Sequence, residues 1–373
     1  IRAFVVEDYR EVVATFTPLL DPLAPTLVSP LSWGVGLGVR AVSDGNETNS
    51  RYQGVWFHGE RSEPKARRLP ADGEEVARIV ARAQRGQARI ETRRTEIRRA
   101  PSPLLYDLTE LQRHANRLYG FSAQNTLDIA QKLYEQHKLI SYPRTDSRYL
   151  SASVAVTLGA VVAAIQEPYQ DRLASGTGQS RLGARFVDDA KVADHHALIP
   201  TTVAARAVLA TDERKIYDLI CRRLLMAWHD EYIWAVTTII TTITTPELAA
   251  DGGAIIDYYH SSGTTEEQAG WKVLEVGADK PAKKTASKRK SKTTEPLAEE
   301  ETSQTLLPYL IIGQTQWVLE ACAVAKQTRP PPRFTEATLL TAMETAGQTL
   351  DDKELSAAMK DSGLGTPATR AAI

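Results

Sequence analysis

The sequence predicts an α+β protein of several domains, in which a sheet-rich region is interrupted by a mostly helical insertion. Its 373 residues exceed the usual size of a single domain. Apolar and polar residues alternate over the first hundred positions, apolar spacing then becomes helical, and β-branched residues return near residue 230. We therefore expect four segments, at 1–105, 106–225, 226–330 and 331–373.

The first segment reads as strands separated by turns. "REVVATF", "WGVGLGVRAV" and "RYQGVWFHG" alternate as half-buried strands do, and "LDPLAP" and "SDGNE" carry turn residues. One helix is expected within "ADGEEVARIVARAQRG", with Asp72 as its N-cap and Gly86 just past its end.

The second segment is expected to be mainly helical, and strands should follow it. "LYDLTELQRHANRLYG" and "SAQNTLDIAQKLYEQHK" place apolar residues at helical spacing, and Ser122 suits the N-cap of the second helix. "YIWAVTTIITTITT", "WKVLEV" and "QWVLEACAV" then predict strands. A sheet domain with an inserted helical domain is the economical interpretation.

The stretch at 278–302 is rich in lysine and then in glutamate, and it has few large apolar residues. It cannot form a core, so we expect a disordered, solvated loop; a flexible polycation that touches a nucleic-acid backbone is the alternative. After it, "RPPPRF" should be extended because proline fixes φ. A helix is expected from its N-cap Thr335 to Gly347.

Composition limits the class of protein. The formal charge is −1, so a nucleic-acid partner would have to be held by local patches. Cys221 and Cys322 lie far apart, which excludes a CxxC zinc site and argues against a disulfide framework, so we expect a reducing cytoplasm. The sequence contains no membrane-length apolar run and no signal peptide. Because the chain starts at Ile1 and stops within an expected helix, we expect a fragment of a longer protein.

The segment "KLISYPRTDSRYLS" has the composition of a phosphate site. Tyr142 and Arg144 are two residues apart, so in an extended segment both side chains leave from one face. A guanidinium matches two oxygens of a phosphodiester, and a nearby cation helps a phenol to act as a nucleophile. Asp146 would orient a basic neighbour, or else form an Asx turn or a helix N-cap before "SRYLS".

A second motif, "VADHHALIPTT", contains His195 and His196. Adjacent histidines are often structural, and their spacing here does not predict a metal site. A histidine beside a phosphodiester could donate a hydrogen bond to a non-bridging oxygen as negative charge develops there.

Taken together, "GFSAQNTLDIAQKLYEQHKLISYPRTDSRYLS", "DHHALIPT", "PPPRFTEATLLTAMETAG" and "GLGTPATRAAI" resemble type IA DNA topoisomerases, most closely the bacterial topoisomerase III branch. The resemblance covers nearly the whole chain and keeps the order of the motifs. It implies that Tyr142 is the nucleophile, Arg144 the transition-state clamp, and Asp146 a supporting residue. It also selects His195 over His196, although Leu198 stands where isoleucine is usual. The DNA-binding residues that the motifs imply are Thr145, Ser147, Ser122, Gln124, Arg333, Thr335, Thr366, Thr369 and Arg370; an ordinary N-cap is the alternative for the threonine motifs.

The resemblance also implies a mechanism. In the family, tyrosine displaces a deoxyribose 3′-oxygen of single-stranded DNA, a 5′-phosphotyrosine forms, a second strand passes, and religation needs no ATP. The sheet-rich parts would form the arch of a torus, and the helical domain would carry Tyr142. The family's Toprim domain, with its acidic residues and Mg²⁺ ligands, has no counterpart in this sequence. We expect no metal ligand in this chain and no strand cleavage by the chain alone.

A protein of another class is the main alternative: a non-catalytic single-stranded-DNA-binding or structural module with the same fold. A metal-dependent tyrosine relaxase would need three suitably spaced histidines, which the sequence lacks. The resemblance further implies a monomer in the bacterial cytoplasm, associated with the nucleoid and without membrane contact. It leaves open whether the longer protein mainly relaxes negative supercoils or decatenates.

Overall fold

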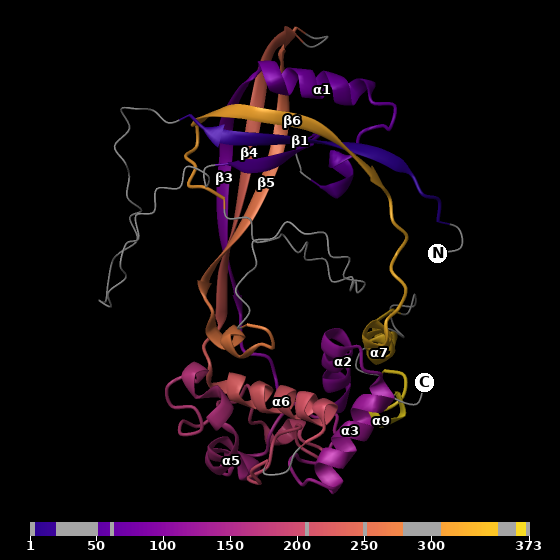
Figure 1. Ribbon diagram of the computed structural model, residues 1–373, viewed down its shortest axis with the longest axis vertical. Helices are drawn as coiled ribbons and strands as arrows, with labels where there is room; N and C mark the ends of the chain where they lie inside the picture. The colour runs from indigo at the N-terminus through magenta and orange to yellow at the C-terminus, as the bar shows by residue number, and fades with distance from the viewer. Residues whose placement is uncertain are drawn as a thin grey trace. The chain divides into compact units, whose positions relative to one another are not determined.

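The computed structural model describes residues 4–19, 51–59, 63–205, 209–248, 252–278, 307–349 and 363–370. The chain divides into two compact units, each assembled from three stretches of sequence (Figure 1). The first unit comprises Ile1–Arg98, Trp234–Glu267 and Ala298–Pro331. The second comprises Arg99–Ile233, Gln268–Leu297 and Pro332–Ile373. The strand expected from "WGVGLGVRAV", the turns beside it, and the lysine-rich loop from residue 279 onward lie outside the described residues.

The first unit is built on strands that close into an antiparallel barrel in the order β1-β2-β5-β4-β3-β6. Their bounds are β1 Asp8–Pro18, β2 Tyr52–Phe57, β3 Gln87–Ala100, β4 Tyr232–Leu248, β5 Ala254–Gln268 and β6 Thr315–Gln327. β1 and β6 pair along their whole common length, with a bulge between Thr15 and Phe16. The strands expected from "REVVATF", "RYQGVWFHG", "YIWAVTTIITTITT" and "QWVLEACAV" are confirmed.

Aromatic side chains fill the barrel core. The ring of Phe16 stacks on that of Tyr52, with centroids 5.2 Å apart, and meets the edge of Tyr259 at 5.5 Å. Helix α1 (Glu74–Arg85) lies beside β1 and β6 (Figure 1) and buries Ile79 and Ala83 in the same core. The spacing of these buried residues gives α1 one apolar face.

One salt bridge joins α1 to β5, between the half-buried Arg82 and the buried Asp257. The Asp257 carboxylate, 3% exposed, accepts hydrogen bonds from Arg82 Nε and Nη2, both at 2.7 Å. The Trp56 indole N–H donates to the same carboxylate at 2.9 Å. The carboxylate hydrogen bond raises the pKa of Arg82. The pair therefore has the partners that a buried charge requires.

The expected ends of α1 are partly wrong. Gly73, with φ of 87°, holds the N-cap position, and Asp72 instead accepts a hydrogen bond from the Glu74 backbone N–H at 3.3 Å. Asp72 lies one residue before the N-cap position, because the backbone there adopts a left-handed conformation that glycine accommodates without strain. Gly86 follows the helix as expected. A Cβ there would lie 2.4 Å from Ile243 Cγ2, so close packing requires glycine.

The second unit is mostly helical. Its longer helices are α2 Leu108–Tyr119, α3 Ala123–Glu135, α5 Leu158–Ile165, α6 Thr211–Leu225 and α7 Glu336–Glu344. The short ones are α4 Ala152–Ala155 and α9 Pro367–Arg370. Ser122 is confirmed as the N-cap of α3, because its hydroxyl accepts from the Asn125 backbone N–H at 3.0 Å. Asp107 caps α2 in the same way, accepting from Glu110 at 2.6 Å.

Two further expectations are wrong. "WKVLEV" forms the 3-10 helix η6 (Gly270–Leu274) instead of a strand, since the chain turns at Gly270 with φ of 49° and buries Leu274 completely. A short apolar run fits a strand or a helical turn equally well. Helix α7 ends at Glu344, and Gly347 lies within a following 3-10 turn (Ala346–Thr349). Among the described residues, no helix is both long enough and apolar enough to cross a membrane.

Candidate active site

Two distant segments of the second unit meet to form the candidate site. The Ser141 backbone N–H donates to the Ile199 carbonyl at 2.9 Å, and the Ser141 hydroxyl accepts from the Ile199 N–H at 3.1 Å. The residues just before Ser141 and Ile199 in the sequence, Ile140 and Leu198, are each 1% exposed and belong to the same apolar cluster. Burial of the flanking apolar residues thus fixes the "YPRTDS" and "HHALIP" motifs against each other.

Tyr142 and His195 are brought side by side by this pairing. Their ring centroids are 4.4 Å apart and the ring planes make an angle of 43°. Thr145, 1% exposed, donates from its hydroxyl to the His195 carbonyl at 3.1 Å and so holds the backbone of the histidine in place. Tyr142 is half-buried and His195 is exposed. A phenol and an imidazole therefore lie together at a surface that a ligand can reach.

Helix α3 supports both Tyr142 and Arg144. The ring edge of Tyr134 meets Tyr142 at 5.5 Å and 81°. With the Gln131 amide placed so that its oxygen faces donors, that oxygen accepts from Arg144 Nη2 at 2.6 Å and from Nε at 3.2 Å. Gln131 and Tyr134 are three residues apart and share one helix face. Tyr142 and Arg144 consequently face the same side of α3, with the Arg144 guanidinium exposed and oriented.

The sequence did not single out Gln131, Tyr134 or Lys138. Lys138 has φ of 57° and places its ammonium group 5.6 Å from the centre of the Tyr134 ring. The Thr201 hydroxyl donates to the Lys138 carbonyl at 2.7 Å, which ties the two motifs together once more. The only available signal was the i, i+3 spacing of Gln131 and Tyr134 in a helix just before the tyrosine motif.

The other residues of the tyrosine motif divide by exposure. Asp146 is exposed and makes no hydrogen bond or ion pair within the described part of the chain. It is not a helix N-cap, because α4 is capped by Ser151. Ser147 is buried and donates to the Lys191 carbonyl at 2.9 Å, while its backbone N–H donates to the Thr145 hydroxyl at 3.1 Å. The two hydroxyls therefore already have protein partners.

Some of the residues expected to bind single-stranded DNA lie at the starts of α3 and α7. The Gln124 amide is exposed and donates to Asp128 at 2.7 Å. The Thr335 hydroxyl accepts from the Thr338 N–H at 3.2 Å as the N-cap of α7, and Arg333 before it is exposed. Helix α7 is joined to the start of α3 within the second unit, since Glu336 accepts from the Ala123 N–H at 2.7 Å.

The last motif folds back on itself. The Thr366 hydroxyl accepts from the Thr369 N–H at 3.3 Å. Arg370 is 8% exposed and donates to the carbonyls of Leu364 at 2.8 Å and Gly365 at 3.0 Å. In this arrangement its guanidinium stabilises the loop.

A cluster of buried titratable groups lies next to the tyrosine motif. The Leu108 N–H, at the start of α2, donates to the Thr145 carbonyl at 3.0 Å. Beside it, burial raises the pKa of Asp107 to about 6 and that of Tyr106 to about 12, and burial lowers the pKa of His114 to about 4. The Tyr106 hydroxyl is hydrogen-bonded to His114. Burial thus favours the neutral form of each of these three groups.

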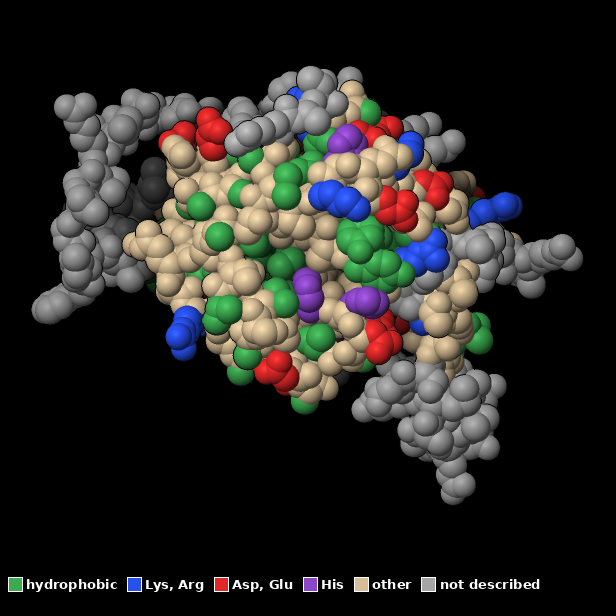
Figure 2. Space-filling model, turned by 90° about the horizontal axis from the view of Figure 1, so that it is seen from below, with side chains coloured by type: hydrophobic (Ala, Val, Ile, Leu, Met, Phe, Trp, Pro, Cys, Tyr) green, Lys and Arg blue, Asp and Glu red, His purple; other side chains and the backbone are tan. Residues whose placement is uncertain are grey.

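Two further observations bear on ligands. Within the described residues, no group of three or more histidine, cysteine, aspartate or glutamate side chains could hold a metal ion. On the face seen in Figure 2, basic and acidic side chains are interspersed, so this face presents no extended field of one sign. Recognition of a polyanion would depend on local groups such as Arg144.

Comparison with known proteins identifies the class. A family model described as DNA topoisomerase matches residues 1–373. The chain belongs to this DNA topoisomerase family, and the resemblance seen in its motifs is confirmed.

Curated relatives narrow the match to DNA topoisomerase 3. The protein of that name from Bacillus licheniformis is 40% identical over 278 residues, which cover 73% of this chain and 34% of the relative. The one from Shouchella clausii is 35% identical over 327 residues, covering 86% and 40%. This chain therefore spans less than half the length of these relatives. A solved structure of full-length topoisomerase I from Thermotoga maritima shares the fold, with a TM-score of 0.57 and 19% identity; the match covers all of this chain and 47% of that one.

Proposed function

We propose that this chain is the part of a type IA DNA topoisomerase that supplies the nucleophile for strand cleavage. The packing of Tyr142 against His195 at 4.4 Å, with Arg144 on the same side of α3, carries the proposal. The Tyr142 oxygen attacks a backbone phosphorus and passes its proton to solvent water, a 5′-phosphotyrosine bond forms, and the bond to the 3′-oxygen breaks. Religation reverses these steps without ATP because the bond energy is kept.

Each neighbouring residue has a role in this scheme. Arg144 binds the non-bridging oxygens of the scissile phosphate through its fork of donors. His195 donates a hydrogen bond to the phosphate as negative charge builds up. Gln131 orients the guanidinium, and Asp146 supports the basic groups around the phosphate. Thr145 and Ser147 hold the loop, and Arg370 supports its own loop from a buried position. The other residues expected to bind DNA line the approach of the single strand: Ser122, Gln124, Arg333, Thr335, Thr366 and Thr369.

The leaving 3′-oxygen needs a proton, and in the family an acid of the Toprim domain supplies it. We place that acid, together with the Mg²⁺ ligands, in a Toprim domain outside this chain, since no cluster of the described residues could hold a metal ion. Loss of one positioned acid commonly lowers a rate by about 10²–10⁴. The chain alone is therefore expected to be inactive. The strands of the first unit would serve as the arch through which a second strand passes, in a monomer that works on bacterial DNA in the cytoplasm.

The test is formation of a covalent adduct. The chain is incubated with end-labelled single-stranded DNA and Mg²⁺, alone and joined to the Toprim portion of a topoisomerase 3 relative, and separated on a denaturing gel. We expect an adduct only with the joined protein, lost in Tyr142→Phe and kept in the control Tyr119→Phe. An adduct that persists in Tyr142→Phe would show that Tyr142 is not the nucleophile. An adduct formed by the chain alone would show that the Toprim portion is not required for cleavage. DNA binding without any adduct would favour the non-catalytic module.

A further inference from the structure

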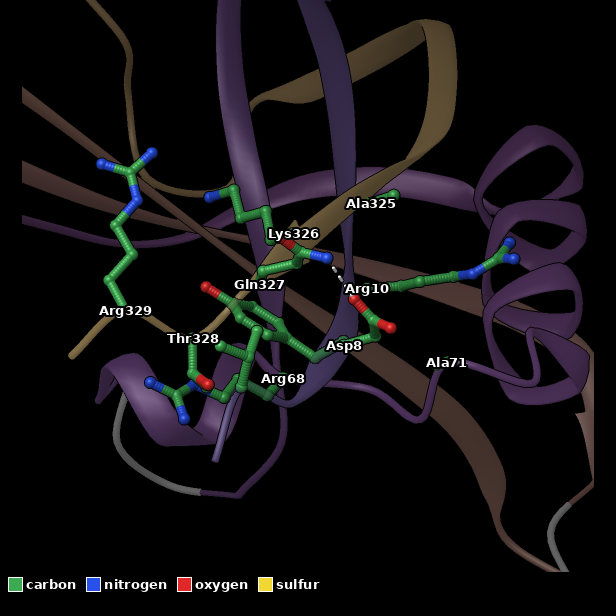
Figure 3. A pocket seen from close by; sticks show the side chains of 11 residues that line it. Asp8, Arg10, Arg68, Ala71, Ala325, Lys326, Gln327, Thr328 and Arg329 are labelled. Carbon is green, nitrogen blue, oxygen red and sulfur yellow. Dashed lines mark hydrogen bonds between the residues drawn. The ribbon is translucent and has the colours of Figure 1, made fainter. Parts of the chain in front are cut away.

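A basic groove of about 990 Å³ lies in the first unit, and it shares no residue with the Tyr142 site. It is formed where β1 begins, β6 ends and the chain leaves the 3-10 helix η2 (Pro64–Arg67) (Figure 3). The residues that define the basic groove are Val6, Asp8, Tyr9, Arg10, Arg68, Ala71, Ala325, Lys326, Gln327, Thr328 and Arg329. Its volume is at the upper end of the range of about 300–1,000 Å³ typical of ligand sites, so it has room for more than a single anion.

Strand pairing sets the side chains of the groove. Tyr9 lies opposite Lys326 in the antiparallel ladder, and directly opposed residues point to the same face. The backbone of Arg10 forms two hydrogen bonds of 2.9 Å with the backbone of Leu69, and this pairing brings Arg68 alongside β1. The Arg68 guanidinium lies 4.9 Å from the centre of the Tyr9 ring. An aromatic ring and a cation thus lie together on a backbone that is fixed by the ladder.

The charge of the groove is predominantly positive. Four of its residues are cationic and one, Asp8, is acidic. Asp8 accepts a hydrogen bond from the Gln327 amide at 2.8 Å, drawn as a dashed line in Figure 3, and Lys326 pairs with Glu11. Arg68 and Arg329 are exposed and make no ion pair with any residue that the structure describes. Figure 3 shows the guanidinium groups of Arg68 and Arg329 on one side of the view, whereas the Arg10 side chain is directed to the other side, toward the helix.

We propose that the basic groove is a second contact for single-stranded DNA, in which Arg68 and Arg329 bind backbone phosphates and Tyr9 provides a stacking surface for a base. Sites for single strands combine a positive groove that follows the backbone with aromatic rings on which bases stack. Arginine matches the paired oxygens of a phosphodiester, and its cation adds to an aromatic stack. The choice of DNA over RNA rests on the proposed function; the groove geometry by itself requires a single-stranded polyanion.

The first test is the salt dependence of binding. Affinity of the 373-residue chain for a fluorescein-labelled oligothymidylate is measured by anisotropy at several salt concentrations. Each phosphate contact contributes a slope of about 0.7 in log affinity against log salt for single strands, so Arg68→Glu with Arg329→Glu should lower the slope by about 1.4 and the affinity by roughly tenfold or more. The matched control is Arg78→Glu with Arg85→Glu, two exposed arginines of α1 with the same charge change. Equal slopes for the two double variants would overturn the proposal.

The second test locates the base. An oligodeoxynucleotide carrying 5-iododeoxyuridine is photo-crosslinked to the chain, and the modified peptide is identified by mass spectrometry. We expect a crosslink at Tyr9 that is kept in Tyr9→Phe, is lost in Tyr9→Ala, and is absent with duplex DNA of the same sequence. A crosslink only outside the groove, duplex binding as tight as that of the single strand, or tighter binding of oligouridylate would each overturn it. Neither readout needs cleavage at Tyr142. The experiments can therefore refute DNA binding in the basic groove without refuting Tyr142 as the nucleophile, and the adduct test can refute Tyr142 without refuting the groove.

Discussion

The buried Asp107 predicts a specific pH dependence of stability. Its pKa rises from 3.8 to about 6 in the folded chain because the carboxyl group is buried. A carboxyl group whose folded pKa is raised contributes stability that is fully present below the unfolded pKa and is lost as pH rises through the folded pKa. Linkage between these two pKa values gives a loss of about 2 kcal/mol between about pH 4.5 and about pH 7.5.

The substitution Asp107→Asn isolates this effect. Asparagine is also a good N-cap, so the start of α2 is retained while the titration is removed. His114 has its pKa lowered to about 4, and its stability contribution is lost as pH falls, so it opposes Asp107 in the unmodified chain. The informative quantity is therefore the difference in unfolding free energy between the chain and Asp107→Asn.

The assay is urea unfolding followed by circular dichroism at 222 nm, at pH values from 4.5 to 7.5. We expect the unmodified chain to lose about 2 kcal/mol relative to Asp107→Asn as pH rises across this range. The matched variant His114→Gln should show the opposite trend, gaining relative stability toward low pH. A pH-independent difference between the chain and Asp107→Asn would refute the inference that burial raises the pKa of Asp107.

Two further predictions concern named contacts. Asp257→Ala should lower the free energy of unfolding by about 2–3 kcal/mol, because the half-buried Arg82 guanidinium and the Trp56 N–H lose the carboxylate that accepts their hydrogen bonds; a loss below about 1 kcal/mol in urea melts would contradict this. Gln131→Ala should slow adduct formation by the joined protein about tenfold, as Arg144 loses two charge-assisted hydrogen bonds, whereas the exposed Asn125→Ala on the same helix should not; equal rates for the two variants would argue against positioning by Gln131.

Much of the fold follows from local sequence signals. The caps and spacing around Ser122 and the β-branched run of β4 specify their elements with little help from the rest of the chain. The failures arose where tertiary packing decides. Gly73 adopts a left-handed conformation and takes the N-cap position of α1 that was expected for Asp72. The apolar run that ends at Leu274 is short, so a single helical turn is enough to bury Leu274.

The candidate site shows the same division. Tyr142, Arg144 and His195 stand out because their chemistry is unusual for their sequence context, and the fold brings Tyr142 and His195 together. Gln131 and Tyr134 do not stand out, because an amide and a phenol on an amphipathic helix have no distinctive signature in one sequence. Their contribution comes only from packing of α3 against the tyrosine motif, a contact between separate segments that periodicity does not reveal.

The pairing of β1 with β6 has a consequence for biosynthesis. The ion pair between Glu11 and Lys326 spans 315 residues, so β1 leaves the ribosome long before its partner exists. At about 5–20 residues per second, that wait lasts roughly 15–60 s. The stretch from Arg99 to Ile233 lies wholly between them and can begin to fold in the meantime. The barrel can close only after β6 has emerged, so the edge of β1 stays without this partner during most of the synthesis of the chain and has to be protected from aggregation.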